Sequence, residues 1–268
     1  MREISKLRLD RLVVERGLAP TREKARRLVL AGEVLVNDSP VAKPGTLVDR
    51  DAAMRLRHPP SPYVGRGGEK LAGALADLRL NVSGLRALDV GASTGGFTDC
   101  LLQQGATHVT ALDVGKAQLD WKLRTDSRVE LMEGVNARHI EPKDFPDRFD
   151  LVTVDVAFIS LGKILPAVRE LIRENGWILA LVKPQFELTK EDVESGGVVR
   201  DPDKHLRAVT QVMEAARQCG LAVEDVVASR LRGVEGNREF FLSLRPGPTG
   251  AARLEELRQQ AKRACAPE

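Results

Sequence analysis

The stretch from Ala87 to Phe97 reads ALDVGASTGGF, and it decides the fold of this chain. It opens with apolar residues interrupted only by Asp89, as in a buried strand, and its glycines allow a tight turn into a helix. The pattern is not Gly-x-Gly-x-x-Gly, which is typical of dinucleotide sites, and it lacks the Gly-Lys-Ser/Thr of a phosphate loop. We therefore predict a strand, turn and helix that bind a ligand other than a dinucleotide or ATP.

Apolar runs and helical patterns alternate from this stretch to the C-terminus. The alternation predicts a mostly parallel sheet with helices on both faces. Little separates the last two strands beyond a turn at residues 233–236, so we expect an antiparallel hairpin at the sheet edge. Seven such strands are typical of a Rossmann-like class I methyltransferase domain. The predicted strands are residues 87–90, 109–113, 129–132, 151–155, 177–182, 223–231 and 240–244. The predicted helices start at Glu69 or cover residues 97–104, 117–124, 161–173, 204–219 and 251–264.

The N-terminal part of the chain is basic. Residues 1–68 contain 14 Lys+Arg and 8 Asp+Glu, a balance of 14 − 8 = +6, whereas the remainder has 41 − 14 = 27 basic and 38 − 8 = 30 acidic residues, a balance of −3. This asymmetry favours a polyanion-binding module, with a solvated basic face as the alternative. Prolines at residues 59, 60 and 62 predict a linker over 59–68, which joins domains at 1–58 and 69–268.

The basic segment has its own pattern of short elements. Leu9, Leu12 and Val13 have the spacing of one helical apolar stripe. Thr21 is predicted to cap a second helix over 22–31, and a strand at 33–36 leads into the turn dipeptide at 37–38. Further short strands are expected at residues 48 and 54–56. The arginines of the second helix suit the phosphates of structured RNA.

This segment resembles the S-four-type (alpha-L) RNA-binding domain. The resemblance is carried by Arg8-Leu9-Asp10, Thr21-Arg22-x-x-Ala25-Arg26-x-Leu28 and Gly32-x-Val34-x-Val36-Asn37. It implies a small α+β domain with RNA as its partner. The predicted RNA-binding residues are Arg8, Arg22, Lys24, Arg26 and Arg27, together with Arg66 beside the second domain.

The sequence shows no pattern for a disulfide framework, a metal site or a membrane-spanning segment. Cys100, Cys219 and Cys265 are isolated and the four histidines are scattered, so neither a disulfide framework nor a metal site is predicted. No apolar run approaches the roughly 18 residues that span a bilayer, and the start of the chain lacks a signal-peptide core. We expect a soluble cytoplasmic protein without a membrane partner, and a monomer.

The turn of the opening stretch also predicts the ligand. Its spacing fits an S-adenosylmethionine loop, with Asp89 at the strand end near the cationic amino-acid part of that cofactor. Asp113 ends the next strand, where a carboxylate can accept both ribose hydroxyls; a loop-capping aspartate is the alternative. Asn136 is expected to bind the adenine or to shape the substrate rim. The predicted cofactor-binding residues are Asp89, Gly91, Ala92, Ser93, Thr94, Gly95, Gly96, Phe97, Asp113 and Asn136.

Four polar residues follow loop or strand ends that such a sheet turns toward one cleft. A ribose 2′-hydroxyl that attacks a methyl sulfonium needs a proton acceptor and an in-line approach. Lys183 is the expected acceptor, and the two carboxylates are expected to orient it. Taken singly, each residue also fits a surface charge or a cap, whereas the ordered set points to ribose methylation. The predicted catalytic residues are Lys70, Asp155, Lys183 and Glu239.

The chain resembles the TlyA family, also called haemolysin A proteins, which are rRNA cytidine 2′-O-methyltransferases with an FtsJ/RrmJ-like catalytic domain. The resemblance implies that Lys183 is the base-like residue and that rRNA or ribosomal subunits are the partner. One departure is Tyr63, where the family is expected to have a tryptophan. The matching blocks are residues 64–71, 89–99, 113–115, 136–138, 155–161, 183–187, 196–201 and 236–240.

Two other functions are kept as alternatives. A membrane-active haemolysin is suggested by the family's second name, and it would need a spanning or strongly interfacial segment. An RNA chaperone or ribosome assembly factor with a non-catalytic methyltransferase domain is the other. Phe158 lies beside Asp155 and is interpreted as a core residue, with stacking on a flipped base as the alternative.

Overall fold

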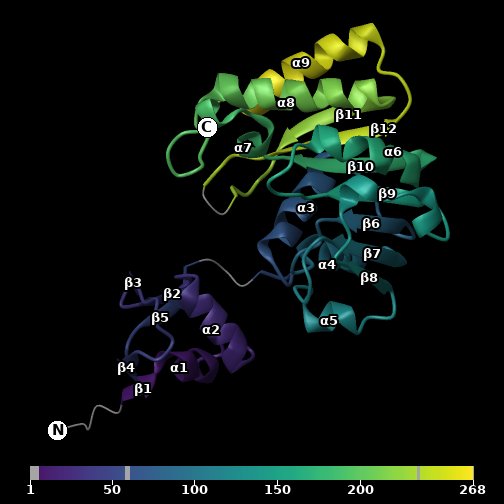
Figure 1. Cartoon of the computed structure of the whole chain (residues 1–268). Helices are drawn as coiled ribbons and strands as arrows, with labels where there is room; N and C mark the ends of the chain where they lie inside the picture. The colour runs from purple at the N-terminus through teal and green to yellow at the C-terminus, as the bar shows by residue number, and fades with distance from the viewer. Residues whose placement is uncertain (1–5, 58–60, 234–235, 268) are drawn as a thin grey trace. The chain divides into compact units, whose positions relative to one another are not determined.

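The computed structural model describes residues 6–57, 61–233 and 236–267 (Figure 1). The chain divides into two compact units, Met1–Pro62 and Tyr63–Glu268, hereafter the N-terminal and C-terminal units. Part of the predicted linker over 59–68 lies outside the described residues, as does His58 at the predicted end of the first domain. The predicted domain boundaries therefore stay predictions.

The N-terminal unit packs two helices on short strands, around fully buried residues such as Leu9 and Val29. Thr21 caps the second helix as predicted, because its hydroxyl accepts a hydrogen bond from Lys24 N. The predicted turn is also confirmed: Asn37 and Asp38 both have positive φ, 48° and 61°. The elements are β1 (Lys6–Arg8), α1 (Leu9–Glu15), α2 (Arg22–Leu30), β2 (Val34–Val36), β3 (Ser39–Pro40), β4 (Leu47–Asp49) and β5 (Met54–Leu56). Strand β1, which the sequence did not predict, pairs with β4, and β2 lies between β3 and β5.

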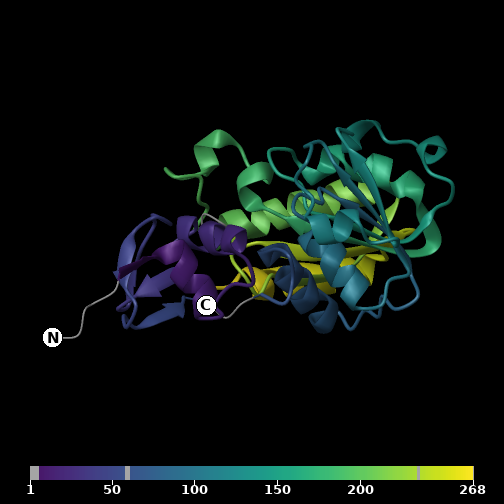
Figure 2. The ribbon, with the colours of Figure 1, turned by 90° about the horizontal axis from the view of Figure 1, so that it is seen from below.

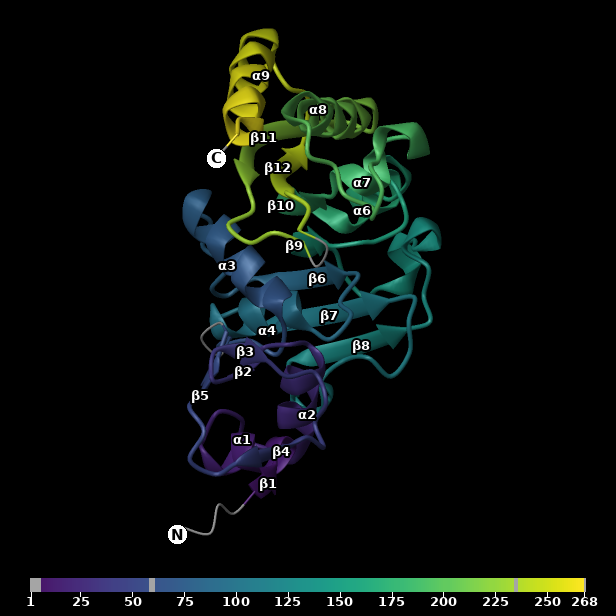
Figure 3. The same cartoon turned by 90° about the vertical axis from the view of Figure 1, so that its left-hand side faces the viewer.

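The C-terminal unit contains the predicted seven-stranded sheet, in the order β11-β12-β10-β9-β6-β7-β8 (Figure 3). Five neighbouring strands are parallel, and β12 runs antiparallel to both β10 and β11. The expected hairpin is thus at the sheet edge, with β11 outermost. The strands are β6 (Arg86–Val90), β7 (His108–Asp113), β8 (Val129–Glu133), β9 (Phe149–Val154), β10 (Ile172–Val182), β11 (Leu221–Ala228) and β12 (Phe240–Pro246).

Helices cover both faces of this sheet, because its strands are apolar on both sides. Helices α3, α4 and α5 share one buried cluster with the strands, and α6, α8 and α9 share the other, so that α3 and α8 lie on opposite faces (Figure 2). The helices are α3 (Arg66–Asp77), α4 (Gly96–Gln103), α5 (Trp121–Arg124), α6 (Leu165–Leu171), α7 (Pro184–Glu187), α8 (Pro202–Gln218) and α9 (Ala251–Cys265). Single 3-10 turns are η1 (Ala137–His139), η2 (Pro142–Asp144), η3 (Leu161–Lys163) and η4 (Lys190–Asp192).

Several predicted boundaries were wrong for local reasons. Helix α3 starts at Arg66 and not at Glu69, because its first turn packs closely on α4 and on Tyr63: a Cβ on Gly68 would lie 2.3 Å from the Tyr63 ring. The predicted helix over 117–124 is helical only from Trp121, since Ala117 has φ +58°. The predicted helix over 161–173 is split into η3 and α6, and residues 172 and 173 already belong to β10.

Strand β11 at the sheet edge is shorter at its C-terminal end than predicted. It ends at Ala228 and not at residue 231. Beyond Ala228, Ser229 N still donates a hydrogen bond to Glu239 O, but the regular pairing with β12 has stopped.

None of the helices in the described part of the chain is both long and apolar enough to cross a bilayer.

Candidate active site

A cavity of about 550 Å³ opens in the C-terminal unit, where β6, β9 and β10 end. Parallel strands bring their carboxyl ends to one edge of the sheet, which is where α/β domains bind ligands. The cavity therefore gathers residues that are far apart in sequence. The lining residues that the sequence predicted are Arg66, Lys70, Gly91, Ala92, Ser93, Thr94, Gly96, Phe97, Asp155, Lys183 and Glu239.

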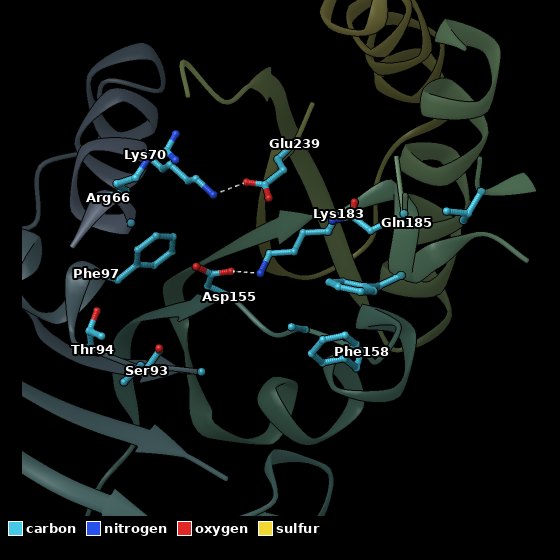
Figure 4. Close-up of a pocket in the computed structure, with 18 residues that line it drawn as sticks. Arg66, Lys70, Ser93, Thr94, Phe97, Asp155, Phe158, Lys183, Gln185 and Glu239 are labelled. Carbon is cyan, nitrogen blue, oxygen red and sulfur yellow. Dashed lines mark hydrogen bonds and ion pairs between the residues drawn. The ribbon is translucent and has the colours of Figure 1, made fainter. Parts of the chain in front are cut away.

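The four predicted catalytic residues meet in this cavity as two ion pairs (Figure 4). Lys70 Nζ donates a hydrogen bond to Glu239 Oε2 at 2.5 Å, and both side chains are nearly buried. Lys183 Nζ lies 2.5 Å from Asp155 Oδ1, a charge contact without hydrogen-bond alignment. Glu239 thus binds Lys70 directly, and Asp155 is the carboxylate in contact with Lys183.

Burial and charge oppose each other at Glu239. Removal of this carboxyl from water raises its pKa above the ordinary value, and the nearby Lys70 and Lys183 partly offset that rise. Glu239 lies directly before β12, and Gly233 lies against its carboxylate, since a Cβ at position 233 would lie 2.6 Å from Glu239 Oε1. The pairing of Glu239 with Lys70 is therefore fixed by both charge and close packing.

The glycine loop after β6 forms one side of the cavity, and two of its glycines are required by space as well as by backbone. Gly91 has φ +85°, and a Cβ on it would lie 2.3 Å from the backbone oxygen of Asp155. Gly95 has φ +94° and faces Leu123, which a Cβ would approach to 2.2 Å. Gly95 therefore packs on Leu123 and does not line the cavity. Gly91 lines the cavity and lies directly against the Asp155 backbone.

Asp113 organises the same loop from the end of β7. Its Oδ2 accepts a hydrogen bond from Ser93 N at 2.7 Å, and its Oδ1 accepts one from Gly115 N at 2.6 Å. A carboxylate has about four acceptor sites, so two backbone bonds leave capacity for a ligand hydroxyl. The predicted ribose contact and the alternative of a loop cap are therefore compatible in one residue.

Two of the predicted RNA-binding arginines of the N-terminal unit pair with a buried aspartate. Asp10 is fully buried, and it accepts hydrogen bonds from Arg8 at 2.9 Å and 3.1 Å and from Arg22 at 3.0 Å. The Arg8 guanidinium, with Arg22, lowers the pKa of Asp10 to about 2. Arg27 pairs with Glu23, and Arg26 is exposed. Arg8 and Arg22 are thus held in place through Asp10, with roughly half of each side chain still open to solvent.

Both units of this chain are similar to known protein families. Residues 63–246 match the model of the FtsJ-like methyltransferase family, and residues 7–53 match that of the S4 domain. The 16S/23S rRNA (cytidine-2′-O)-methyltransferase TlyA of Mycobacterium tuberculosis is 44% identical to this chain over 258 residues, which cover 96% of each protein. This chain belongs to the TlyA family. It is a methyltransferase with an S4 domain, as the sequence predicted.

Two further relatives are similar to this chain over most of its length. Hemolysin A of Brachyspira hyodysenteriae is 40% identical over 238 residues, which cover 88% of this chain and 98% of that protein. A solved structure from Streptococcus thermophilus, described as a candidate hemolysin, is 40% identical, with a TM-score of 0.75 and 97% of each chain covered. Its likeness extends over both units of this TlyA-family chain.

Asp89 of this TlyA-family chain does not reach the cavity. Its side chain is fully buried, and it accepts hydrogen bonds from Thr98 Oγ1 at 2.7 Å and from Thr153 Oγ1 at 3.0 Å. Burial raises its pKa to about 6, although both hydroxyls stabilise the charged form. The predicted direct contact between Asp89 and a cofactor therefore has no support in this geometry, and Asp89 instead ties α4 to β6 and β9.

We expect Asp89 to make stability fall as the pH rises. Folded Asp89 keeps its proton up to about pH 6, whereas an unfolded aspartate loses it near 3.8. The folded state therefore binds more protons between these values, so the contribution is complete below pH 3.8 and lost above pH 6. Relative to Asp89→Asn, the free energy of unfolding should drop by about 2 kcal/mol between pH 4 and pH 7. Urea titrations of both proteins measure this difference, and parallel pH profiles would contradict it.

Asp113 and Asn136 also lie outside the cavity lining, whereas Arg66 belongs to it. Asn136 accepts a hydrogen bond from Arg138 N and so caps η1; its predicted contact with the adenine stays a prediction. Arg66 lies on the rim, exposed, and donates to the Arg232 carbonyl at 3.3 Å.

The interpretation of Phe158 as a core residue was wrong. Its side chain is 92% exposed, its φ is +63°, and its ring lies 5.0 Å from that of Phe186 at the side of the cavity opposite the glycine loop (Figure 4). Sequence reasoning did not identify Phe186 and Gln185 individually, although both lie in the matching block 183–187. The remaining unforeseen lining residues are Gly67, Ala157, Val193 and Gly197.

Proposed function

We propose that this protein transfers a methyl group from S-adenosylmethionine to the 2′-oxygen of a cytidine in ribosomal RNA. The observation that carries the proposal is the meeting of the Lys70–Glu239 and Lys183–Asp155 pairs in one cavity beside the glycine loop. The name of the mycobacterial relative, a 16S/23S rRNA (cytidine-2′-O)-methyltransferase, supports the same reaction and leaves both ribosomal subunits as candidates.

The residues after β6 and β7 fit S-adenosylmethionine. Gly91 brings bare backbone to the cavity wall, where a Cβ would collide with Asp155, and Gly96 lines the same wall. Asp113 keeps free acceptor capacity for ribose hydroxyls, as described above. When bound, S-adenosylmethionine supplies an electrophilic methyl group. We assign Gly91–Thr94, Gly96 and Asp113 to holding it.

The chain's own residues have to orient the ribose hydroxyl and receive its proton. Lys183 is the proposed acceptor. A positioned base contributes about 10²- to 10⁴-fold to the rate of such reactions. The Asp155 carboxylate, whose Oδ1 lies 2.5 Å from Lys183 Nζ, orients the amine, which accepts the hydroxyl proton in its neutral form. Glu239 neutralises Lys70, and this pair closes the side of the cavity toward α3.

The exposed aromatic pair gives the proposed place for the base. Phe158 lies on the far side of the Lys183–Asp155 pair from Phe97 and Thr94 (Figure 4), and its ring is 5.0 Å from that of Phe186. Enzymes that act on one nucleotide commonly stack the extruded base on aromatic side chains, and each such contact is worth about 1–3 kcal/mol. The S4 domain, with exposed Arg26, is proposed to bind the surrounding RNA.

Mapping of 2′-O-methyl groups tests the proposal. Ribosomal RNA from cells with and without the gene is compared, and purified protein is then incubated with subunits from the deletion strain and radiolabelled cofactor. We expect at least one cytidine to be methylated only when the protein is present. Absence of any such cytidine, together with no calorimetric binding of S-adenosylmethionine, would favour an RNA chaperone; leakage of liposomes by the pure protein would favour the haemolysin alternative.

A further inference from the structure

Two separate loops supply the aromatic pair of the cavity. Phe158 lies between β9 and η3, and Phe186 lies in α7, after β10. Their ring centroids are 5.0 Å apart, and the rings are inclined by 50°. The geometry of the pair therefore depends on how these two loops are fastened to each other.

The Phe158 loop has a conformation that is costly in isolation. A non-glycine residue at φ +63° lies in a sparsely populated region of backbone conformation and is strained. An exposed phenylalanine ring also lacks the stabilisation that burial in a hydrophobic core would provide. Contacts with neighbouring residues are therefore needed to offset both costs.

Glu187 supplies those contacts at the end of α7. Its Oε2 accepts a hydrogen bond from Ser160 Oγ at 2.6 Å, and its Oε1 accepts one from Leu161 N at 2.8 Å. Both donors follow Phe158 by two and three residues, and Glu187 follows Phe186 directly. The carboxylate thus joins the Phe158 loop to α7, close in sequence to both rings.

Glu187 is a largely buried carboxylate whose hydrogen bonds come from the Phe158 loop. Burial raises the pKa of this carboxyl above its ordinary value, and within the described residues no cation forms an ion pair with it. Both carboxylate oxygens are instead used by the Phe158 loop. Ser160 Oγ in turn accepts a hydrogen bond from Gly162 N at 3.2 Å, so the clamp also fixes the start of η3.

We propose that Glu187 is a positioning residue that holds Phe158 and Phe186 as a rigid platform for the extruded base. This inference rests on the proposed function for the identity of the ligand. Glu187 acts through the aromatic pair and does not itself line the cavity. Its removal should therefore weaken substrate use without affecting the cofactor.

A double-mutant cycle between Glu187→Ala and Phe158→Ala tests this role. On subunits that the wild-type protein methylates, Phe158→Ala should lower kcat/KM by about 5- to 150-fold, the range for loss of one stacked base. Glu187→Ala alone should lower it about tenfold, because slight misplacement of a positioning group can cost up to about a hundredfold. In the Phe158→Ala background the same change should cost less than about twofold, since the two residues act as one unit. Affinity for S-adenosylmethionine should stay unchanged throughout.

Two variants calibrate the cycle. Ser160→Ala removes one of the two hydrogen bonds and should give a smaller loss than Glu187→Ala. Glu170→Ala, which removes an exposed glutamate on α6, should have no effect. Multiplicative losses in the double mutant would overturn the proposal, because they would show that Glu187 acts independently of Phe158.

A crystal structure of Glu187→Ala, determined without RNA, tests whether Glu187 holds the two rings in place. We expect Phe158 to leave the left-handed region of φ and the two rings to separate, in a protein whose remaining fold is unchanged. An aromatic pair that persists in this variant would overturn the proposal. Absence of rRNA methylation by the wild-type protein would contradict the proposed function instead, and the crystal structure would still report on the clamp.

Discussion

Lys183→Ala is expected to lower the rate of methyl transfer by about a thousandfold, with the affinity for S-adenosylmethionine retained. The magnitude follows from the loss of a positioned proton acceptor, which contributes about 10²- to 10⁴-fold. The substitution also leaves the Asp155 carboxylate, which is 21% exposed, without its cationic partner 2.5 Å away. Single-turnover assays on subunits from the deletion strain, with calorimetry for the cofactor, measure both quantities.

Lys183→Arg separates the two roles that a lysine can play here. Arginine keeps the positive charge beside Asp155 but cannot give up its proton in a protein. If Lys183 accepts the hydroxyl proton, Lys183→Arg should be nearly as inactive as Lys183→Ala. Substantial activity in the arginine variant would show that Lys183 only orients the hydroxyl and that the proton leaves by another group.

Lys163→Ala is the matched control for these variants. Lys163 is an exposed lysine of η3, outside the cavity lining, so its loss should change neither the rate nor the cofactor affinity. Wild-type rates in Lys183→Ala would contradict the proposed role of Lys183 outright. A loss of cofactor affinity as large as the loss of rate would instead place Lys183 in the cofactor site.

The fold was predictable because its main signals are local. Apolar runs that end in polar residues mark buried parallel strands, and the glycine loop after Asp89 marks the turn into α4. The predictions failed where one residue overrides a helical pattern. Ala117, with φ +58°, delays α5 to Trp121, and no property of alanine announces this. The start of α3 was missed because it depends on packing between Gly68 and Tyr63.

The candidate site was predictable only as a set of residues and not as a set of contacts. Lys70 and Glu239 are 169 residues apart, so which carboxylate pairs with which lysine depends on how the sheet brings strand ends together. For the same reason Asp89 could not be recognised as a buried residue held by Thr98 and Thr153. Exposure of Phe158 was also unpredictable, because the pattern of an apolar residue after a strand is normally typical of a core.

Gly91→Ala is expected to remove both cofactor binding and methyl transfer. Alanine at φ +85° pays roughly 1–2 kcal/mol for the left-handed backbone. Its Cβ would also lie 2.3 Å from the Asp155 backbone oxygen and 2.9 Å from its carbonyl carbon, so the loop and β9 must move apart. That movement displaces the wall for the cofactor and draws Asp155 away from Lys183. We expect methyl transfer below about 1% of wild type, in line with the cost of misplaced catalytic groups, and a loss of at least about 3 kcal/mol in the free energy of unfolding.

Gly84→Ala isolates the part of this effect that comes from the backbone alone. Gly84 has nearly the same conformation, φ +81°, but no atom lies within 4 Å of the position its Cβ would take. This variant should therefore lose only about 1–2 kcal/mol of stability and keep full activity. Urea unfolding and methyl transfer measured on both variants separate strain from collision. Equal losses in the two proteins would show that the backbone conformation, and not the contact with Asp155, is what makes glycine necessary at position 91.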